Sequence, residues 1–253
     1  MTTPLLWHFP ISHFNEKVRW ALDWKGIPHL RRALAASYLP RAWWASGQGS
    51  LPILFLDGRA IADSTRIIAT LEERYPQAPL YPADVEARRR ALALEDFFDE
   101  ELGRGLRAAM LGPVFTRDPV AAIGMLATGM PPGSARMMQS IAPVFRAFYR
   151  ARHDINEATV AAGRTKVAVA LDRIEAELGP SGYLVGDHFT VADLTAAALF
   201  GVLLFPPELQ YRPTAPLPPE IVAFREALAD RPALRWVGEM FRRHRGRSAE
   251  VPA

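Results

Sequence analysis

The segment 51–56, Leu-Pro-Ile-Leu-Phe-Leu, constrains the fold of this chain more than any other stretch. It is an apolar run that begins around Pro52 and ends at Asp57-Gly58, a dipeptide typical of two-residue hairpin turns. Proline is disfavoured in a central strand because it cannot donate a ladder hydrogen bond. Its presence is explained if the bond before it is cis and Leu51 turns its backbone groups toward a ligand. We therefore predict a strand over residues 51–56 and a hairpin partner near residues 59–61.

The residues before this hairpin predict a β-α-β unit. Residues 5–9 form a short apolar run, and from about residue 14 apolar side chains recur at helical spacing. Gly26 and Pro28 end that helix, because glycine suits the left-handed position after a helix and proline cannot continue one. A second strand is expected over residues 29–34, joined to the first by a right-handed crossover.

Two further segments complete the first part of the chain. Residues 40–49 are expected to be irregular or weakly helical. After the hairpin, Asp63 or Ser64 caps a helix that ends before Pro76. The resulting order, β-α-β-(α)-β-β-α, is the thioredoxin-like order, and we assign it to an N-terminal domain over residues 1–78.

The remaining residues, 84–253, are expected to form an all-helical C-terminal domain. Thr190 and Asp193 have the spacing of a capping box, which predicts a buried helix running to about residue 205. A proline-rich connection follows over residues 206–219. The other expected helices are one long helix from about residue 84 past residue 110, a short one near 119–127 within a loop over 112–138, and helices at 140–153, 157–178, 220–228 and after Pro232.

Composition excludes several kinds of site. The chain has no cysteine, so it has neither a disulfide nor a cysteine nucleophile, and no metal-ligand spacing is evident among its six histidines. The net charge of +3 does not indicate nucleic-acid binding. The cluster Arg242, Arg243, Arg245 and Arg247 is interpreted as a solvated helix end and tail. No signal peptide or membrane-spanning segment is evident, so a cytoplasmic protein is expected.

Three segments resemble the signature segments of glutathione S-transferases: residues 12–22, residues 49–54 and the pair Asp63-Ser64. They occur in the family's order and at its approximate spacing, and the segment 184–194 is a fourth similarity. The resemblance implies the two-domain architecture described above, glutathione as co-substrate, a hydrophobic electrophile as second substrate, and a homodimer.

By this resemblance, Ser12 is the thiol-activating residue. It precedes a helix N-terminus, where backbone N–H groups and the helix dipole favour an anion. A serine hydroxyl there can donate a hydrogen bond to a bound thiolate and lower the thiol pKa. His8 and His13 are the competing candidates, and a simple capping role is the alternative for Ser12.

The resemblance also implies where glutathione binds. Leu51, next to the predicted cis Pro52, would pair its backbone with the cysteinyl part, as an added strand does. Asp63 and Ser64 would hold the γ-glutamyl group. One departure stands out, because residues 43–50 lack the basic residue that many relatives use for the glycyl carboxylate. Three alternatives therefore stay open: glutathione, another small thiol, or no thiol.

The electrophile pocket is expected between the two domains. Its candidate wall residues are Phe97, Met110, Leu111, Phe115, Trp43 and Trp44. The sequence thus predicts an enzyme that joins a glutathione-type thiol to a hydrophobic electrophile. Two alternatives remain: a ligandin-like carrier without turnover, and a protein-interaction member of the same superfamily.

Overall fold

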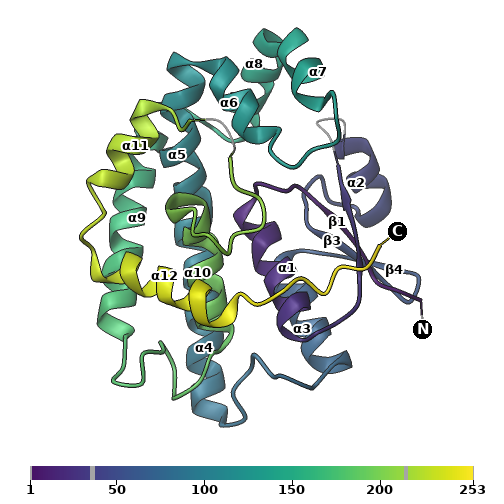
Figure 1. Cartoon of the computed structure of the whole chain (residues 1–253), viewed down its shortest axis with the longest axis vertical. Helices are drawn as coiled ribbons and strands as arrows, with labels where there is room; N and C mark the ends of the chain where they lie inside the picture. The colour runs from purple at the N-terminus through teal and green to yellow at the C-terminus, as the bar shows by residue number, and fades with distance from the viewer. Residues whose placement is uncertain (1, 35–37, 214–215, 253) are drawn as a thin grey trace.

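A four-stranded mixed sheet forms the N-terminal part of the molecule (Figure 1). In this computed structural model, which describes residues 2–34, 38–213 and 216–252, the strand order is β2-β1-β3-β4. β1 is parallel to β2 and antiparallel to β3, and β3 is antiparallel to β4. This is the predicted thioredoxin-like arrangement. The strands are β1 (Leu5–His8), β2 (Leu30–Ala33), β3 (Ile53–Leu56) and β4 (Arg59–Ala62).

Local sequence signals explain the turns of this sheet. Asp57 and Gly58 have φ values of 48° and 78°, and two successive residues with positive φ make the tight turn that joins β3 to β4. Gly26, with φ of 60°, follows the end of α1 (His13–Trp24) as predicted. The peptide bond between Leu51 and Pro52 is cis, also as predicted.

Of the two alternatives given for residues 40–49, irregular or weakly helical, the structure shows the helix: α2 (Tyr38–Ser46) covers residues 40–46. Pro40 lies in its first turn, where a missing N–H costs nothing. Ala42 is fully buried and packs with Ile53 and Ala62 into a small cluster on one face of the sheet. The packing of one small residue therefore fixes this helix.

The other face of the sheet joins the helical body. α1 contacts α3 (Ser64–Arg74) and also α10 (Val191–Leu204), so α1 lies between the sheet and the helical body (Figure 1). The main hydrophobic core includes residues from both parts, among them Leu54 on β3, Val18 on α1 and Leu199 on α10. The sheet and helical body therefore share one continuous core.

The predicted helices of the C-terminal part are confirmed. Three outcomes differ: α4 and α5 are joined by a π-helical turn at Phe98–Leu102, and the predicted loop over 112–138 is helical at residues 112–117 and again from residue 134, where α7 begins. Residues 214–215, within the predicted proline-rich connection, lie outside the described residues. The remaining helices are α4 (Val85–Phe97), α5 (Gly103–Arg117), α6 (Pro119–Leu126), α7 (Ser134–Ser140), α8 (Ala142–Arg152), α9 (Glu157–Glu177), α11 (Pro219–Glu226) and α12 (Pro232–His244).

Close packing of α5 against α9 explains why the loop prediction failed. A Cβ on Gly112 would lie 2.3 Å from Val160 Cγ2, and one on Gly163 would lie 2.4 Å from the carbonyl oxygen of Gly105. These glycines let two helices approach each other; they do not mark a loop. Within the described part of the chain, no helix is long and apolar enough to cross a membrane.

The predicted capping box at the start of α10 is present. Thr190 donates to Oδ2 of Asp193 from its backbone nitrogen at 2.9 Å and from its hydroxyl at 2.8 Å. The backbone nitrogen of Leu184 donates to the other carboxylate oxygen at 2.9 Å. Burial raises the pKa of Asp193 to about 6, and these hydrogen bonds act in the opposite direction. The box therefore secures α10 inside the core.

The interpretation of the C-terminal arginine cluster as wholly solvated was wrong for one member. Arg242, Arg243 and Arg247 are exposed, but Arg245 is fully buried. Its guanidinium donates to Glu16 and Asp23 on α1. The chain beyond α12 thus runs back across the N-terminal part, and Val251 donates to the carbonyl of His29 at 2.9 Å.

Candidate active site

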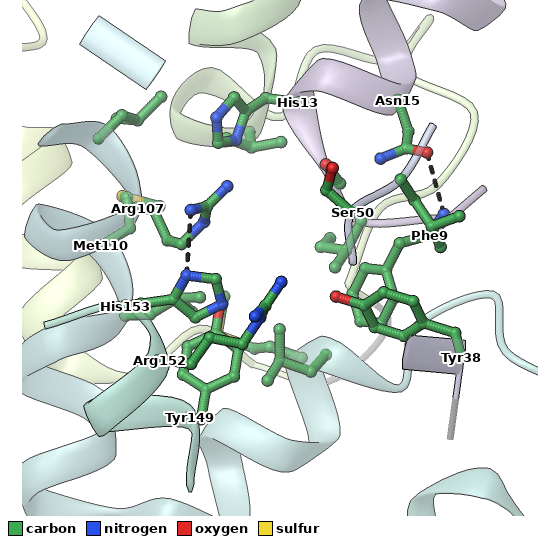
Figure 2. Close-up of a pocket in the computed structure, with 18 of the residues that line it drawn as sticks. Phe9, His13, Asn15, Tyr38, Ser50, Arg107, Met110, Tyr149, Arg152 and His153 are labelled. Atoms are coloured by element: carbon green, nitrogen blue, oxygen red, sulfur yellow. Dashed lines mark hydrogen bonds between the residues drawn. The ribbon is translucent and has the colours of Figure 1, made fainter. Parts of the chain in front are cut away.

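A cleft of about 380 Å³ lies between the N-terminal part and the helical body. Figure 2 shows side chains facing each other across it, with Ser50, Asn15 and Tyr38 on one side and Arg107, Arg152 and His153 on the other. Ser12 also lines it. A volume of this size is typical of a small-molecule site.

Ser12 is the N-cap residue of α1, but its side chain makes no capping hydrogen bond. Its backbone nitrogen donates to the carbonyl of Phe9 at 3.1 Å, and its carbonyl accepts from Glu16 at 2.9 Å. Phe9 in turn donates to the buried side chain of Asn15 at 3.2 Å. The loop is therefore held on both sides, while the serine hydroxyl remains available to a ligand.

The loop before Ser12 is also held from inside the molecule. Arg19 donates to the carbonyl of Pro10 at 2.8 Å, to Nδ1 of His8 at 3.0 Å and to Glu16 at 2.9 Å. His8 is only 1% exposed and does not line the cleft. Burial, with the nearby charge of Arg19, lowers the pKa of His8 to about 2. His8 therefore anchors the loop and does not face the cleft.

The predicted glutathione-binding residues are only partly brought together. Leu51 lines the cleft, and its backbone N–H and C=O make no hydrogen bond with another described residue. Pro52, Asp63 and Ser64 lie outside the cleft lining. Of these four predicted residues, Leu51 is thus the one that lines the cleft, and its backbone N–H and C=O are free to bind a ligand there.

Asp63 and Ser64 begin α3. Asp63 is exposed and caps α3 by accepting from the backbone nitrogen of Arg66 at 3.1 Å. Its φ of 78° is uncommon for a residue with a side chain, and such strain is concentrated at functional sites. Ser64 is 5% exposed. The capping role predicted for this pair belongs to Asp63.

The helical wall of the cleft carries charges that the sequence analysis did not single out. Arg107 on α5 donates from a terminal nitrogen to Nδ1 of His153 at 3.2 Å. Arg152, the last residue of α8, donates to the carbonyl of Gly49 across the cleft. Among the described residues that line the cleft there is no aspartate or glutamate. No spacing in the sequence indicates that Arg107 lies next to Arg152 and His153, because 46 positions separate Arg107 from His153.

The two histidines in the cleft are neutral. Burial and the charge of Arg107 lower the pKa of His13 to about 3, although the carbonyl of Gly103 acts in the opposite direction. Burial, Arg107 and Arg152 lower the pKa of His153 to about 3 as well. Burial raises the pKa of the Tyr149 hydroxyl to about 12. Near neutral pH, the formal charge of the cleft therefore comes from its two arginines.

Of the residues predicted to line an electrophile pocket, two line the cleft and four do not. Met110 and Leu111 line the cleft. Phe115 is instead fully buried in the core, and Phe97 packs against the core outside the cleft lining. The two tryptophans were wrongly assigned, because Trp43 is 65% and Trp44 88% exposed on α2. The inward side of α2 is used by Ala42, so its two neighbours point to solvent.

Comparisons with known proteins agree with this architecture. A family model described as "Glutathione S-transferase, N-terminal domain" matches residues 6–79, and one described as "Glutathione S-transferase, C-terminal domain" matches residues 137–232. Maleylpyruvate isomerase from Ralstonia sp. is 34% identical over 93 residues, which are 35% of this chain and 44% of that protein. The matches span less than half the length of the curated relatives.

Solved structures extend the similarity to nearly the whole chain. The beta-etherase LigF from Sphingobium sp. matches with a TM-score of 0.61 and 21% identity, over 94% of this chain and 99% of that one. A glutathione S-transferase from Methylobacterium radiotolerans, in complex with glutathione sulfonate, matches with a TM-score of 0.58 and 24% identity, over 92% and 93%. Similarity at these identities establishes the fold. Together with the two family models, it shows that this chain belongs to the glutathione S-transferase superfamily and carries both of its domains.

Proposed function

We propose that the protein is a glutathione-dependent transferase in which Ser12 stabilises the thiolate that attacks a hydrophobic electrophile. The observation that carries the proposal is the unpaired Ser12 hydroxyl at the N-terminus of α1, facing a cleft with apolar walls. A hydroxyl that donates to the sulfur, next to the positive end of a helix dipole, favours the thiolate over the thiol. The thiolate is the nucleophile, so its population limits the rate.

The thiol would bind along the edge of β3. The backbone of Leu51 is free to pair with the cysteinyl part of glutathione, next to the cis bond before Pro52. Asp63 and Ser64 would take the γ-glutamyl group at the start of α3. The relative from Methylobacterium radiotolerans holds a glutathione derivative on the same fold, which supports this choice of thiol.

Arg152 supplies a cation that the sequence segment 43–50 lacks. It reaches from α8 to the carbonyl of Gly49, directly before Ser50 and Leu51. Its charge would hold the glycyl carboxylate of glutathione from the opposite wall of the cleft. The helical part of the chain would thereby complete the thiol site. A homodimer and a cytoplasmic location remain predictions from the family resemblance.

Calorimetric titration with glutathione tests this function, with Ser64→Ala and Ser12→Ala compared with the native chain. Ser64→Ala should weaken binding, whereas Ser12→Ala should retain binding and raise the pKa of the bound thiol, measured by the ultraviolet absorbance of the thiolate. Turnover of a benzyl halide should fall with Ser12→Ala in proportion to the lost thiolate.

Two results would contradict the proposal. An unchanged thiol pKa and unchanged turnover in Ser12→Ala would remove Ser12 from the mechanism. Binding of apolar ligands without any glutathione binding would favour the carrier alternative. Native-like thermal unfolding of each variant is the control for folding.

A further inference from the structure

The cleft contains a positive charge that no described residue neutralises with a carboxylate. Arg107 is half-buried on α5 and has no carboxylate partner among the described residues. The fully buried arginine side chains do have one: Arg19 contacts Glu16 at 2.8 Å, Arg31 contacts Asp23 at 2.8 Å and Arg245 contacts Glu16 at 2.5 Å. The half-buried Arg150 and Arg225 donate to backbone carbonyls, but neither lines the cleft. A guanidinium cannot lose its proton in a protein, so partial burial without a counter-ion favours binding of an anion.

His153 gives this site a second hydrogen-bond donor. Arginine has no acceptor atom, so the contact between Arg107 and Nδ1 of His153 requires that Nδ1 accept. The proton of the neutral ring is then on Nε2. The ring is held in place by Tyr149, whose ring centroid lies 4.5 Å away and which stacks in turn on Phe115. Arg107 and His153 therefore present N–H groups to the same cleft from two helical segments.

The surroundings of this pair accept a hydrocarbon group. The same cleft is lined by the apolar side chains of Met110, Leu111, Met125, Phe145, Val202 and Phe205. An occupant of this wall with one negative group at Arg107 would satisfy both the apolar and the charged parts of the site. A wholly apolar occupant would leave the guanidinium without a partner.

The two arginines of the cleft have different hydrogen-bond partners. Arg152 donates to the carbonyl of Gly49, next to Ser50 and Leu51, whereas Arg107 donates to His153 and lies beside Met110 (Figure 2). One arginine is thus placed for the glycyl carboxylate of glutathione, and the other is left for the second substrate.

We propose that Arg107 and His153 form a subsite for a carboxylate carried by the electrophile, so that the substrate class is a hydrophobic organic acid. The inference rests on the proposed function, which supplies the thiolate. In the transfer, the sulfur of glutathione forms a bond to an electrophilic carbon while the leaving group departs with the bonding electron pair. The substrate carboxylate keeps its charge throughout and fixes the orientation of that carbon toward Ser12.

The first experiment measures binding without chemistry. The Kd values of p-toluate and of methyl p-toluate are determined by calorimetry for the native chain, with and without glutathione, and for Arg107→Met. The charge-assisted contact predicts that the substitution raises the Kd of p-toluate by about 10-fold or more and changes that of the ester by less than about twofold. The matched control is Arg104→Met, an exposed arginine on the same helix, which should leave both constants unchanged.

The second experiment tests the same pair in turnover. Reaction of glutathione with p-(bromomethyl)benzoate forms a benzylic thioether and releases bromide, and the methyl ester of this compound reacts in the same way. After correction for the uncatalysed rates, Arg107→Met should lower kcat/KM for the acid by about 10-fold and leave that for the ester within about twofold. Arg107→Lys, which keeps the charge, should recover part of the loss and guards against a folding defect in the first variant.

The outcomes separate this inference from the proposed function. Equal losses for acid and ester, or the same loss in Arg104→Met, would overturn the subsite. A raised Kd for glutathione in Arg107→Met, with no effect on p-toluate, would assign Arg107 to the carboxylate of the thiol instead and would also overturn it. Selective binding of p-toluate by a protein that binds no glutathione would support the subsite while contradicting the transferase.

Discussion

Arg245, directly after α12, donates from Nε to Oε1 of Glu16 on α1 at 2.5 Å, although 229 positions separate them in the sequence. The other oxygen of Glu16 accepts from Arg19, which holds the carbonyl of Pro10 in the loop before Ser12. A residue near the C-terminus is thereby connected, through two buried side chains, to the loop that positions the proposed thiol-activating serine.

We expect Arg245→Met to lower the free energy of unfolding by about 3–5 kcal/mol, because it leaves buried carboxylates with one partner fewer. Arg242→Met is the matched control, since Arg242 pairs with Glu239 on the surface and its loss should leave the urea midpoint unchanged. Urea denaturation followed by circular dichroism measures both. Equal midpoints for Arg245→Met and the native chain would mean that the buried network does not stabilise the fold.

The close contact of α5 with α9 predicts a second stability difference. Gly163→Ala would bring a methyl group to 2.4 Å from the carbonyl of Gly105, and the helices would have to separate at a cost of about 1–3 kcal/mol. Gly124→Ala, on α6, meets nothing within 4 Å and should stabilise the chain by about 0.5–1 kcal/mol. The two midpoints in urea should therefore move in opposite directions, and a shift in the same direction would contradict the packing described.

The buried histidines predict a loss of stability in acid. His8 and His13 have ordinary pKa values of 6.5 that burial lowers to about 2 and about 3 in the folded chain. At a pH below 6.5 but above the pKa in the folded chain, each histidine is protonated in the unfolded chain and neutral in the folded one. Above pH 6.5 these two histidines therefore do not reduce the free energy of unfolding. Below that pH they lower it by about 1 kcal/mol per histidine per pH unit.

His13→Gln tests this dependence. In the variant, the unfolding free energy should depend less steeply on pH than in the native chain. The difference in slope should correspond to roughly one proton, measured by urea denaturation between about pH 5 and 7. Carboxylate titration contributes equally to the native and variant slopes and cancels in the comparison. Parallel slopes would show that His13 becomes protonated in the folded protein.

Arg152 gives a prediction for the thiol site. Arg152→Gln should raise the Kd of glutathione by about 3- to 10-fold, because one charged contact to a carboxylate is lost. The pKa of the bound thiol should stay unchanged, in contrast to Ser12→Ala. Arg146→Gln, on the same helix but outside the cleft lining, is the control. Unchanged glutathione binding in Arg152→Gln would mean that another group holds the glycyl carboxylate.

The parts of the fold that were predicted correctly depend on neighbours in sequence. The hairpin at Asp57-Gly58, the helix end at Gly26 and the capping box of Thr190 and Asp193 each need only residues within a few positions. Their backbone preferences act before any tertiary contact forms. The error at residues 112–117 arose where packing of α5 against α9 overrode the glycine signal.

The sequence by itself determined the order of strands and helices, the family resemblance and the placement of Ser12 before a helix, because these follow from local backbone preferences and motif spacing. Tertiary structure alone decided that Arg107 meets His153, that Arg152 reaches Gly49 and that Arg245 is buried on α1. Each of these pairs is far apart in the chain, and charge partners at such separations are set by how the helices pack. The charge of the cleft, and with it the proposed class of substrate, is therefore a property of the folded protein.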